Sequence, residues 1–143
     1  MTAPALIGTW MLLDFTITYA DGRPPLQPLG AAAQGMIVYA ADGHLSAVLS
    51  RPARTSGSAG LEQGRVSVSS GDYVSYAGRW RLEGELVHHT VLLSLVPEVV
   101  GQTLTRRAVL TDGELTLSYD LTPRSGITRH YRLRWRRPRE HAV

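Results

Sequence analysis

Two adjacent histidines, His88 and His89, stand in the middle of the otherwise apolar run LVHHTVLLSL at residues 86–95. Histidine can act as a general acid or base near neutral pH, because its ordinary pKa lies close to that pH. Successive side chains of a β-strand point to opposite faces, so only one of the two imidazoles can face a given interior. The strands and turns around the pair must decide which one does.

The elements that position these residues are expected to be β-strands, since turn signals recur at regular spacing and no long helical periodicity is present. Three connections read as two-residue hairpin turns: Asp42-Gly43, Glu83-Gly84 and Asp112-Gly113. They alternate with long connections, so an antiparallel meander places all tight turns at one end and all long loops at the other. The expected strands span residues 8–19, 35–41, 44–50, 73–82, 85–94, 103–111, 114–122 and 128–136.

Eight such strands predict an all-β fold: a single domain over residues 1–143 that forms an antiparallel up-and-down β-barrel with a central ligand cavity. The cavity is expected to open at the end that carries the long loops. The connection at residues 51–72 is long and rich in Gly, Ser and Arg, so we expect it to act as a mobile lid.

The turn at Glu83-Gly84 fixes the register of its hairpin and pairs Gly78 with His89. This register points His89 inward, where the missing side chain of Gly78 leaves room for the imidazole. His88 then faces outward, among the arginines of the preceding strand. The inward row of the two strands consists of Tyr76, Trp80, Val87, His89, Val91 and Leu93.

The turn at Asp112-Gly113 pairs Arg106 with Tyr119 on an otherwise apolar inward row. Burying an ion alone costs several kcal/mol, so Arg106 needs a carboxylate, a ligand anion or water as its partner. Asp14 is the candidate carboxylate if the even-numbered residues of the first strand face inward. An inward row of odd-numbered residues is equally compatible with the sequence and leaves Asp14 outside.

The polar residues of the interior define the candidate site. The candidate catalytic residues are His89, Arg106 and Tyr119, and each also has a structural explanation, as a satisfied core residue or as part of an internal ion pair. Ligand contacts are expected from Tyr76, Trp80, Val91, Leu93, Leu104, Tyr131 and Asp14. A floor at the closed end is expected from Trp80, Val87, Leu110, Leu115 and Trp135.

The composition excludes several classes of chemistry. The chain has no cysteine and all 15 basic residues are arginine, which excludes thiolate chemistry, a lysine Schiff base and a P-loop lysine. The histidines lack a metal-ligand spacing, and neither a Gly-rich nucleotide motif nor Gly-x-Ser-x-Gly occurs. No apolar run is long enough to span a membrane, and no signal-peptide pattern opens the chain. We expect a cytoplasmic protein with no metal, cofactor, membrane partner or nucleic-acid partner; a homodimer is left open.

The first strand begins with LIGTW, which resembles the Gly-x-Trp start of lipocalin-type barrels. The stretches GMIVYAADGHLSAVLSRP, YVSYAGRW, HHTVLLSLVPEVVGQTLTRR and DGELTLSY extend the resemblance to the bacterial lipocalin-like domain family over residues 6–121. The resemblance implies a lipocalin-like barrel and a hydrophobic small-molecule ligand, and such barrels also occur as cofactor-free cyclases or isomerases in natural-product pathways. The matching residues are Gly8, Trp10, Tyr39, Asp42, Gly43, Ser46, Tyr76, Gly78, His89, Ser94, Pro97, Gly101 and Arg106.

Three functions remain open. The favoured one is a cofactor-independent cyclase or isomerase, in which His89 acts as acid or base and Arg106 or a tyrosine such as Tyr119 stabilises an enolate or oxyanion. The alternative is a non-catalytic binding or carrier protein that uses the same cavity. The third is an interaction module that binds nucleic acid or another anionic partner through the arginine-rich last strand.

Overall fold

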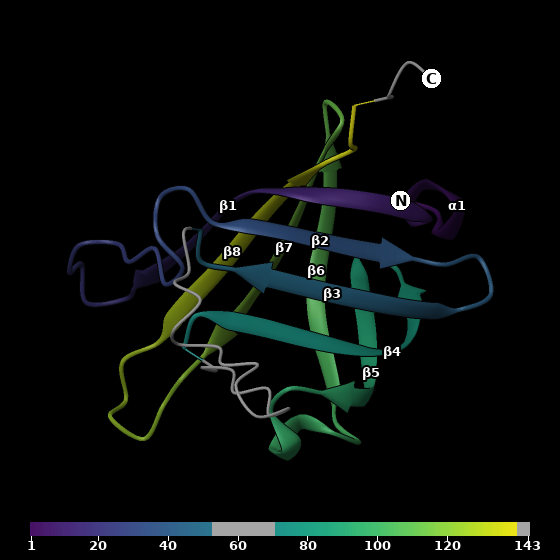
Figure 1. Cartoon of the computed structure of the whole chain (residues 1–143). Coiled ribbons are helices and arrows are strands. Elements are labelled where there is room, and N and C mark those ends of the chain that lie inside the picture. The colour runs from purple at the N-terminus through teal and green to yellow at the C-terminus, as the bar shows by residue number, and fades with distance from the viewer. Residues whose placement is uncertain (53–70, 140–143) are drawn as a thin grey trace, which may run out of the picture.

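Eight antiparallel strands close into a barrel in the computed structural model, which describes residues 1–52 and 71–139 (Figure 1). Each strand pairs with its neighbours in the chain, and the last returns to pair with the first. The expected up-and-down barrel is confirmed, with strand ends within two residues of the predicted ones. The elements are α1 (Ala3–Leu6), β1 (Gly8–Tyr19), β2 (Gln34–Tyr39), β3 (His44–Ser50), β4 (Tyr73–Glu83), β5 (Leu86–Ser94), a 3-10 turn (Pro97–Val99), β6 (Thr103–Thr111), β7 (Glu114–Leu121) and β8 (Arg129–Arg136).

The long connections meet at one end of the barrel and the tight turns at the other. Tyr19 pairs with Arg129, so the connections that follow β1 and precede β8 lie at the same end. Ser50 closes β3 at that end too, since it pairs with the first residues of β2 and β4. The predicted separation of long and short connections is therefore confirmed. Most of the predicted lid at 51–72 lies outside the described residues, which omit 53–70.

Helix α1 covers part of the end that carries the tight turns (Figure 1). Leu6 of this helix is fully buried, and the Trp10 indole N–H donates to its carbonyl oxygen at 2.9 Å. The Arg137 guanidinium lies 3.9 Å from the centre of the Trp10 ring and donates to the Ala5 carbonyl. This helix was not predicted from the sequence. The predicted place of Leu110 in the floor is wrong, because Leu110 is 38% exposed and borders a hollow beside α1.

The buried apolar core draws on the barrel strands, on α1 and on the connection between β1 and β2. Leu29 and Ala33 of that connection are among its members, so this long loop is anchored to the barrel. Side chains of β4 pack against the core and stay part-buried. The buried members are Leu6, Trp10, Leu29, Ala33, Ile37, Tyr39, Leu45, Ala47, Leu49, Val87, Ala108, Leu115, Leu117, Leu133 and Trp135.

Two of the tight turns contain an Asp-Gly pair, but they differ in length. Asp112 and Gly113 have φ angles of 52° and 79°, as a two-residue type I′ turn requires, so this predicted turn is confirmed. The loop at Asp42-Gly43 has three central residues instead of two. The Ala40 amide donates to the His44 carbonyl and so brackets residues 41–43.

The turn between β4 and β5 lies one residue later than predicted. Glu83 pairs with Leu86, so the central residues are Gly84 and Glu85. Gly84 has a φ of 60° at the first central position, which is where a type II′ turn needs glycine. The predicted turn would have required the left-handed conformation at Glu83, where a β-carbon makes it unfavourable.

This shift moves the pairing of the hairpin by two positions, so Trp80 lies opposite His89 in place of Gly78. A shift of two keeps every side chain on its face, and His89 points inward as predicted. The predicted role of Gly78 is wrong. A β-carbon at Gly78 would lie 1.8 Å from the Thr90 carbonyl oxygen, so glycine is required there by the neighbouring backbone.

A bulge in β1 changes which of its residues face inward. Leu12 pairs with Trp135 and Asp14 pairs with Arg134, which leaves Leu13 as the extra residue. Even-numbered residues therefore face inward before Leu13 and odd-numbered residues face inward after it. Each of the two rows considered in the sequence is correct for one half of the strand.

A second bulge lies in β5. Gly78 pairs with Val91 and Ala77 pairs with Leu93, so Leu92 is the extra residue. Beyond the bulge the faces are exchanged, and Leu93 is 70% exposed. The predicted inward orientation of Leu93 is therefore wrong.

Candidate functional site

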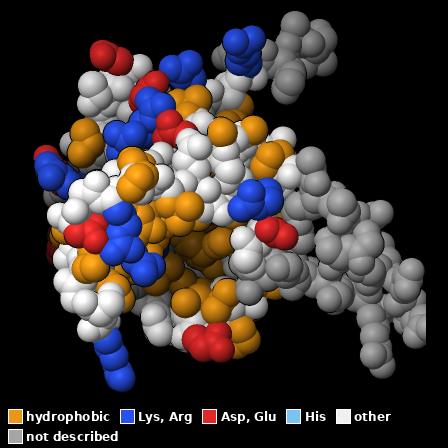
Figure 2. Space-filling model, turned by 90° about the vertical axis from the view of Figure 1, so that its left-hand side faces the viewer, with side chains coloured by type: hydrophobic (Ala, Val, Ile, Leu, Met, Phe, Trp, Pro, Cys, Tyr) orange, Lys and Arg blue, Asp and Glu red, His pale blue; other side chains and the backbone are white. Residues whose placement is uncertain are grey.

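The inward-facing residues enclose a pocket of about 140 Å³. Figure 2 looks at the end of the barrel that carries the long connections and shows a hollow lined by hydrophobic side chains there. Most of the pocket lining is apolar, and polar groups come from β4, β5, β6, β7 and β8. The lining residues are Phe15, Ile37, Ala47, Leu49, Val74, Tyr76, His89, Arg106, Leu117, Tyr119, Leu133 and Trp135.

The polar centre of the pocket is a chain of three side chains, Tyr39, His89 and Tyr76. His89 is 1% exposed, and both of its ring nitrogens are hydrogen-bonded. The Tyr39 hydroxyl oxygen lies 2.7 Å from Nε2, and the Tyr76 hydroxyl oxygen lies 2.8 Å from Nδ1. The residues come from β2, β5 and β4, so the chain runs across the barrel interior.

The direction of this hydrogen-bond chain follows from the burial of Tyr39. Its hydroxyl is buried with His89 as its one polar partner among the described residues, so its proton is satisfied by donation to Nε2. Nε2 then accepts, and a neutral imidazole carries its proton on Nδ1. Nδ1–H donates to the Tyr76 oxygen. The Tyr76 O–H is left as a donor beside the pocket.

All three members of the chain are neutral at neutral pH. Burial lowers the pKa of His89 from 6.5 to about 3, and the charges of Arg106 and His88 act in the same direction. Burial raises the pKa of Tyr76 from 10.0 to about 12 and also raises the pKa of Tyr39 well above its ordinary value. His89 is therefore suited to relay a hydrogen bond and is a weak base.

Arg106 and Tyr119 lie together in the pocket wall, as the sequence predicted. The Arg106 guanidinium carbon is 3.6 Å from the centre of the Tyr119 ring, a cation–π contact. Its Nη1 donates to the Thr105 carbonyl at 3.3 Å. Tyr119 stacks on Tyr131 with 4.6 Å between ring centres, and burial raises its pKa. In the described part of the chain, no carboxylate lies within ion-pair distance of Arg106.

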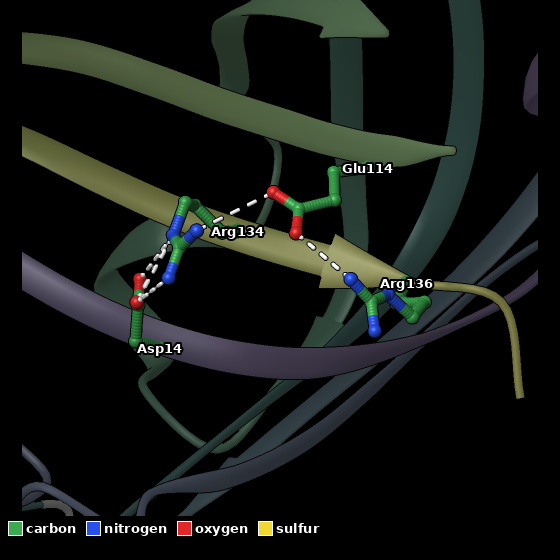
Figure 3. Close-up of polar contacts among 4 residues, drawn as sticks. All are labelled: Asp14, Glu114, Arg134 and Arg136. Carbon is green, nitrogen blue, oxygen red and sulfur yellow. Dashed lines mark hydrogen bonds and ion pairs between the residues drawn. The ribbon is translucent and has the colours of Figure 1, made fainter. Parts of the chain in front are cut away.

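Asp14 does not supply that carboxylate, and its predicted inward orientation is wrong. The bulge at Leu13 turns Asp14 to the outer face of the barrel, where it is bound by Arg134 of β8 (Figure 3). Glu114 of β7 extends the network, accepting from Arg134 at 3.3 Å and from Arg136 at 3.0 Å. Two of the outward arginines of the last strand are therefore paired with acids.

Four other predicted contact residues lie in the barrel wall without lining the pocket. The Trp80 indole N–H donates to the Ala40 carbonyl at 2.9 Å, and its ring packs edge-on against Tyr39. Leu104 is the ladder partner of His89, and Val91 is fully buried. Tyr131 contributes by stacking on Tyr119. These residues support the side chains that line the pocket.

His88 faces the outer side of the barrel, as predicted, but it is not an open surface residue. It is 9% exposed, with Nδ1 2.8 Å from the Thr105 hydroxyl and Nε2 3.2 Å from a Glu83 carboxylate oxygen. It pairs with Arg81 in the ladder. Its polar atoms are thus satisfied by its neighbours, away from the pocket.

Tyr39 was not predicted at the site, and Trp135 was predicted in the floor of the barrel and not among the ligand contacts. Tyr39 was among the residues that match the family pattern, and that was its one signal. It meets His89 across the barrel, and no hairpin turn relates β2 to β5. Trp135 lines the pocket, and its buried indole N–H has no hydrogen-bond partner among the described residues.

A second hollow of about 430 Å³ lies beside β1, β2 and β3 and is more open than the pocket. Its lining has no charged side chain and consists of Met11, Leu12, Ala33, Gln34, Gly35, Met36, Val48 and Ser50. We call it the β1–β2 groove. It contains none of the histidines, tyrosines or arginines of the candidate site.

Within residues 1–52 and 71–139, no cluster of three or more His, Cys, Asp or Glu side chains is placed to hold a metal ion. In the same residues, no helix combines the length and apolar character needed to cross a membrane.

Comparison with known proteins concerns mainly the fold. A family model described as a lipocalin-like domain matches residues 7–138 of the chain. Among solved structures, an uncharacterized protein from Bacteroides eggerthii is similar, with 15% identity, a TM-score of 0.41, and coverage of 89% of this chain and 98% of that one. A similarity at that level carries no argument about the site. No curated protein matches the chain significantly.

Proposed function

Because the chain belongs to the lipocalin-like domain family, we propose that it binds one small, largely apolar molecule in the pocket inside its barrel. The observation that carries the proposal is the lining of that pocket: mostly aliphatic and aromatic, with a few polar groups from Tyr76, His89, Arg106 and Tyr119. Small-molecule sites have this composition, in which apolar walls supply affinity and a few polar groups fix orientation.

The size of the pocket limits the ligand. Its volume of about 140 Å³ is close to that of an apolar cavity of roughly 150 Å³ that takes benzene in another protein. A molecule with one ring, or an aliphatic chain of similar volume, fits without rearrangement of the described residues. We propose a carrier or sequestering role for such a molecule in the cytoplasm, by a single barrel domain over residues 1–143 that uses no metal or cofactor; a homodimer stays open.

A cofactor-independent cyclase or isomerase acting on a natural-product intermediate is the second candidate. The Tyr76 hydroxyl and the Arg106 guanidinium favour it, because donors in a buried pocket can stabilise an enolate or oxyanion. In the part of the chain that the structure describes, the enzyme candidate lacks an effective general base. The described pocket lining has no carboxylate, the chain has no lysine, and a histidine with a pKa of about 3 takes up a proton poorly. Binding without chemistry therefore ranks first.

The third function, recognition of an anionic partner by the last strand, has less support. Arg134 and Arg136 are engaged by Asp14 and Glu114 on the outer face of the barrel. Arginines that are already paired offer less to a phosphate backbone than a free cationic stripe does.

Filling the pocket tests the proposed binding. Ala47 lines the pocket from β3, so Ala47→Leu is expected to abolish binding of toluene, measured by titration calorimetry, while circular dichroism shows a folded barrel. Ala77→Leu makes the same change on the outer face of β4 and is expected to keep the affinity. Equal toluene affinity in Ala47→Leu and the wild type would overturn the proposed site.

The enzyme candidate has its own assay. Exchange of the α-protons of cyclohexanone in D₂O, followed by proton NMR, reports enolisation directly. Faster proton exchange with the wild type, lost in Tyr76→Phe, would favour the isomerase. If the wild type does not accelerate the exchange, the result favours the binding protein.

A further inference from the structure

We propose that the preferred occupant of the pocket is a small monocarboxylate with an apolar body, about the size of benzoate, whose carboxylate accepts hydrogen bonds from Arg106 and Tyr76. The inference rests on the proposed binding function and names the chemical class of the ligand. It is drawn from the charge of the pocket, from the direction of its hydrogen bonds and from the distribution of its apolar side chains.

Within the described residues, the pocket carries a positive charge that no carboxylate neutralises. Arg106 is the one charged residue in the described lining. Its partners among the described residues are the Tyr119 ring and the Thr105 carbonyl, which attract a cation without neutralising it. Asp14, the carboxylate expected from the sequence, is held outside by Arg134. A cation in an apolar wall is stabilised by an anion that brings its own charge and two acceptor oxygens.

The hydrogen bonds of the pocket also favour a ligand that accepts hydrogen bonds. The chain from Tyr39 through His89 ends with the Tyr76 O–H as a donor beside the pocket. The lining therefore offers hydrogen-bond donors from Tyr76 and Arg106, and both match a ligand that accepts hydrogen bonds.

The remainder of the lining defines the rest of the ligand. Phe15, Ile37, Leu49, Val74, Leu117 and Leu133 are apolar and leave no polar group to receive a second charge. The volume of about 140 Å³ accommodates one ring-sized body beside the carboxylate. Dicarboxylates and sugars would leave polar groups against these side chains without partners.

The test compares benzoate with benzamide, its neutral analogue of nearly equal shape, in titration calorimetry at neutral pH. We expect the wild type to bind benzoate at least roughly tenfold more tightly, since hydrogen bonds to a charged group are stronger than neutral ones. Arg106→Met, which keeps an apolar stem, is expected to remove this preference. Tyr76→Phe is expected to lower the affinity for benzoate several-fold. Arg107→Met, on the outer face and paired with Glu85, removes the same charge and is the control that keeps the preference.

Toluene separates the failure of this inference from the failure of the proposed function. If the wild type binds toluene but binds benzoate no more tightly than benzamide, the inferred ligand class is wrong and the proposed binding in the pocket is still supported. If benzoate is preferred equally in the wild type and in Arg106→Met, Arg106 is not its partner and the inference is overturned. If neither toluene, benzoate nor benzamide binds, both the proposed function and the inference fail. Toluene binding by Arg106→Met shows that the pocket of this variant is folded.

Discussion

Acidification is expected to destabilise the fold through the buried imidazole of His89. Burial lowers its pKa from 6.5 to about 3, so the unfolded chain binds the proton more readily than the folded one between these values. The stability that depends on neutral His89 is therefore complete above pH 6.5. It is lost progressively as the pH falls from 6.5 towards 3.

The size of this effect follows from the two pKa values. At pH 5.0 the imidazole of the unfolded chain is almost fully protonated and that of the folded chain is still neutral. The difference amounts to about 2 kcal/mol at pH 5.0 and close to zero at pH 7.5. The imidazole is almost completely buried, so screening by solvent reduces this value little.

The assay is urea unfolding at pH 7.5 and pH 5.0, followed by tryptophan fluorescence, for the wild type and for His89→Gln. The wild type should lose about 2 kcal/mol more than the variant between the two pH values, because acidic residues titrate in both proteins and cancel in the difference. His88→Gln is the matched control: it keeps His89 and should therefore retain the loss that depends on His89. Equal losses in the wild type and His89→Gln would refute the reasoning that His89 is buried and neutral.

Three further changes test the fold around the site. Gly78→Ala should lower the free energy of unfolding by about 3 kcal/mol or prevent folding, because the added carbon meets the Thr90 carbonyl; a small loss in thermal denaturation would contradict this. Asp14→Asn should lower the free energy of unfolding in urea by about 1 kcal/mol or less, and this loss should become smaller as salt is added. The variant should bind toluene as the wild type does, and a loss of toluene affinity would place Asp14 inside the barrel. His88→Ala should cost about 1 kcal/mol in urea unfolding and leave benzoate affinity unchanged; a tenfold weaker affinity would place it at the pocket.

The parts of the site that the sequence predicted are those fixed by local turn chemistry. Asp112-Gly113 can adopt positive φ at both central positions, so one register follows and Arg106 is correctly brought to Tyr119. At Glu83-Gly84 the glycine can occupy either central position, and the sequence alone does not choose. The inward orientation of His89 survived this error because the two registers differ by an even number of residues.

The parts that the sequence missed depend on tertiary structure. The bulges at Leu13 and Leu92 exchange the faces of their strands, and nothing in the local pattern of these apolar residues marks an extra residue. The same limitation put Asp14 and Leu93 in the cavity. Tyr39 reaches His89 across the barrel, and closure of the barrel sets that distance.

The proposed ligand enters the pocket inside the barrel and not the β1–β2 groove. The most direct measurement is a toluene titration of ¹³C-labelled protein, followed by methyl NMR. We expect shifts at the methyl groups of Ile37, Leu117 and Leu133, which line the pocket, with those of Met11 and Met36 unchanged. Shifts at Met11 and Met36 with Ile37, Leu117 and Leu133 unchanged would contradict it.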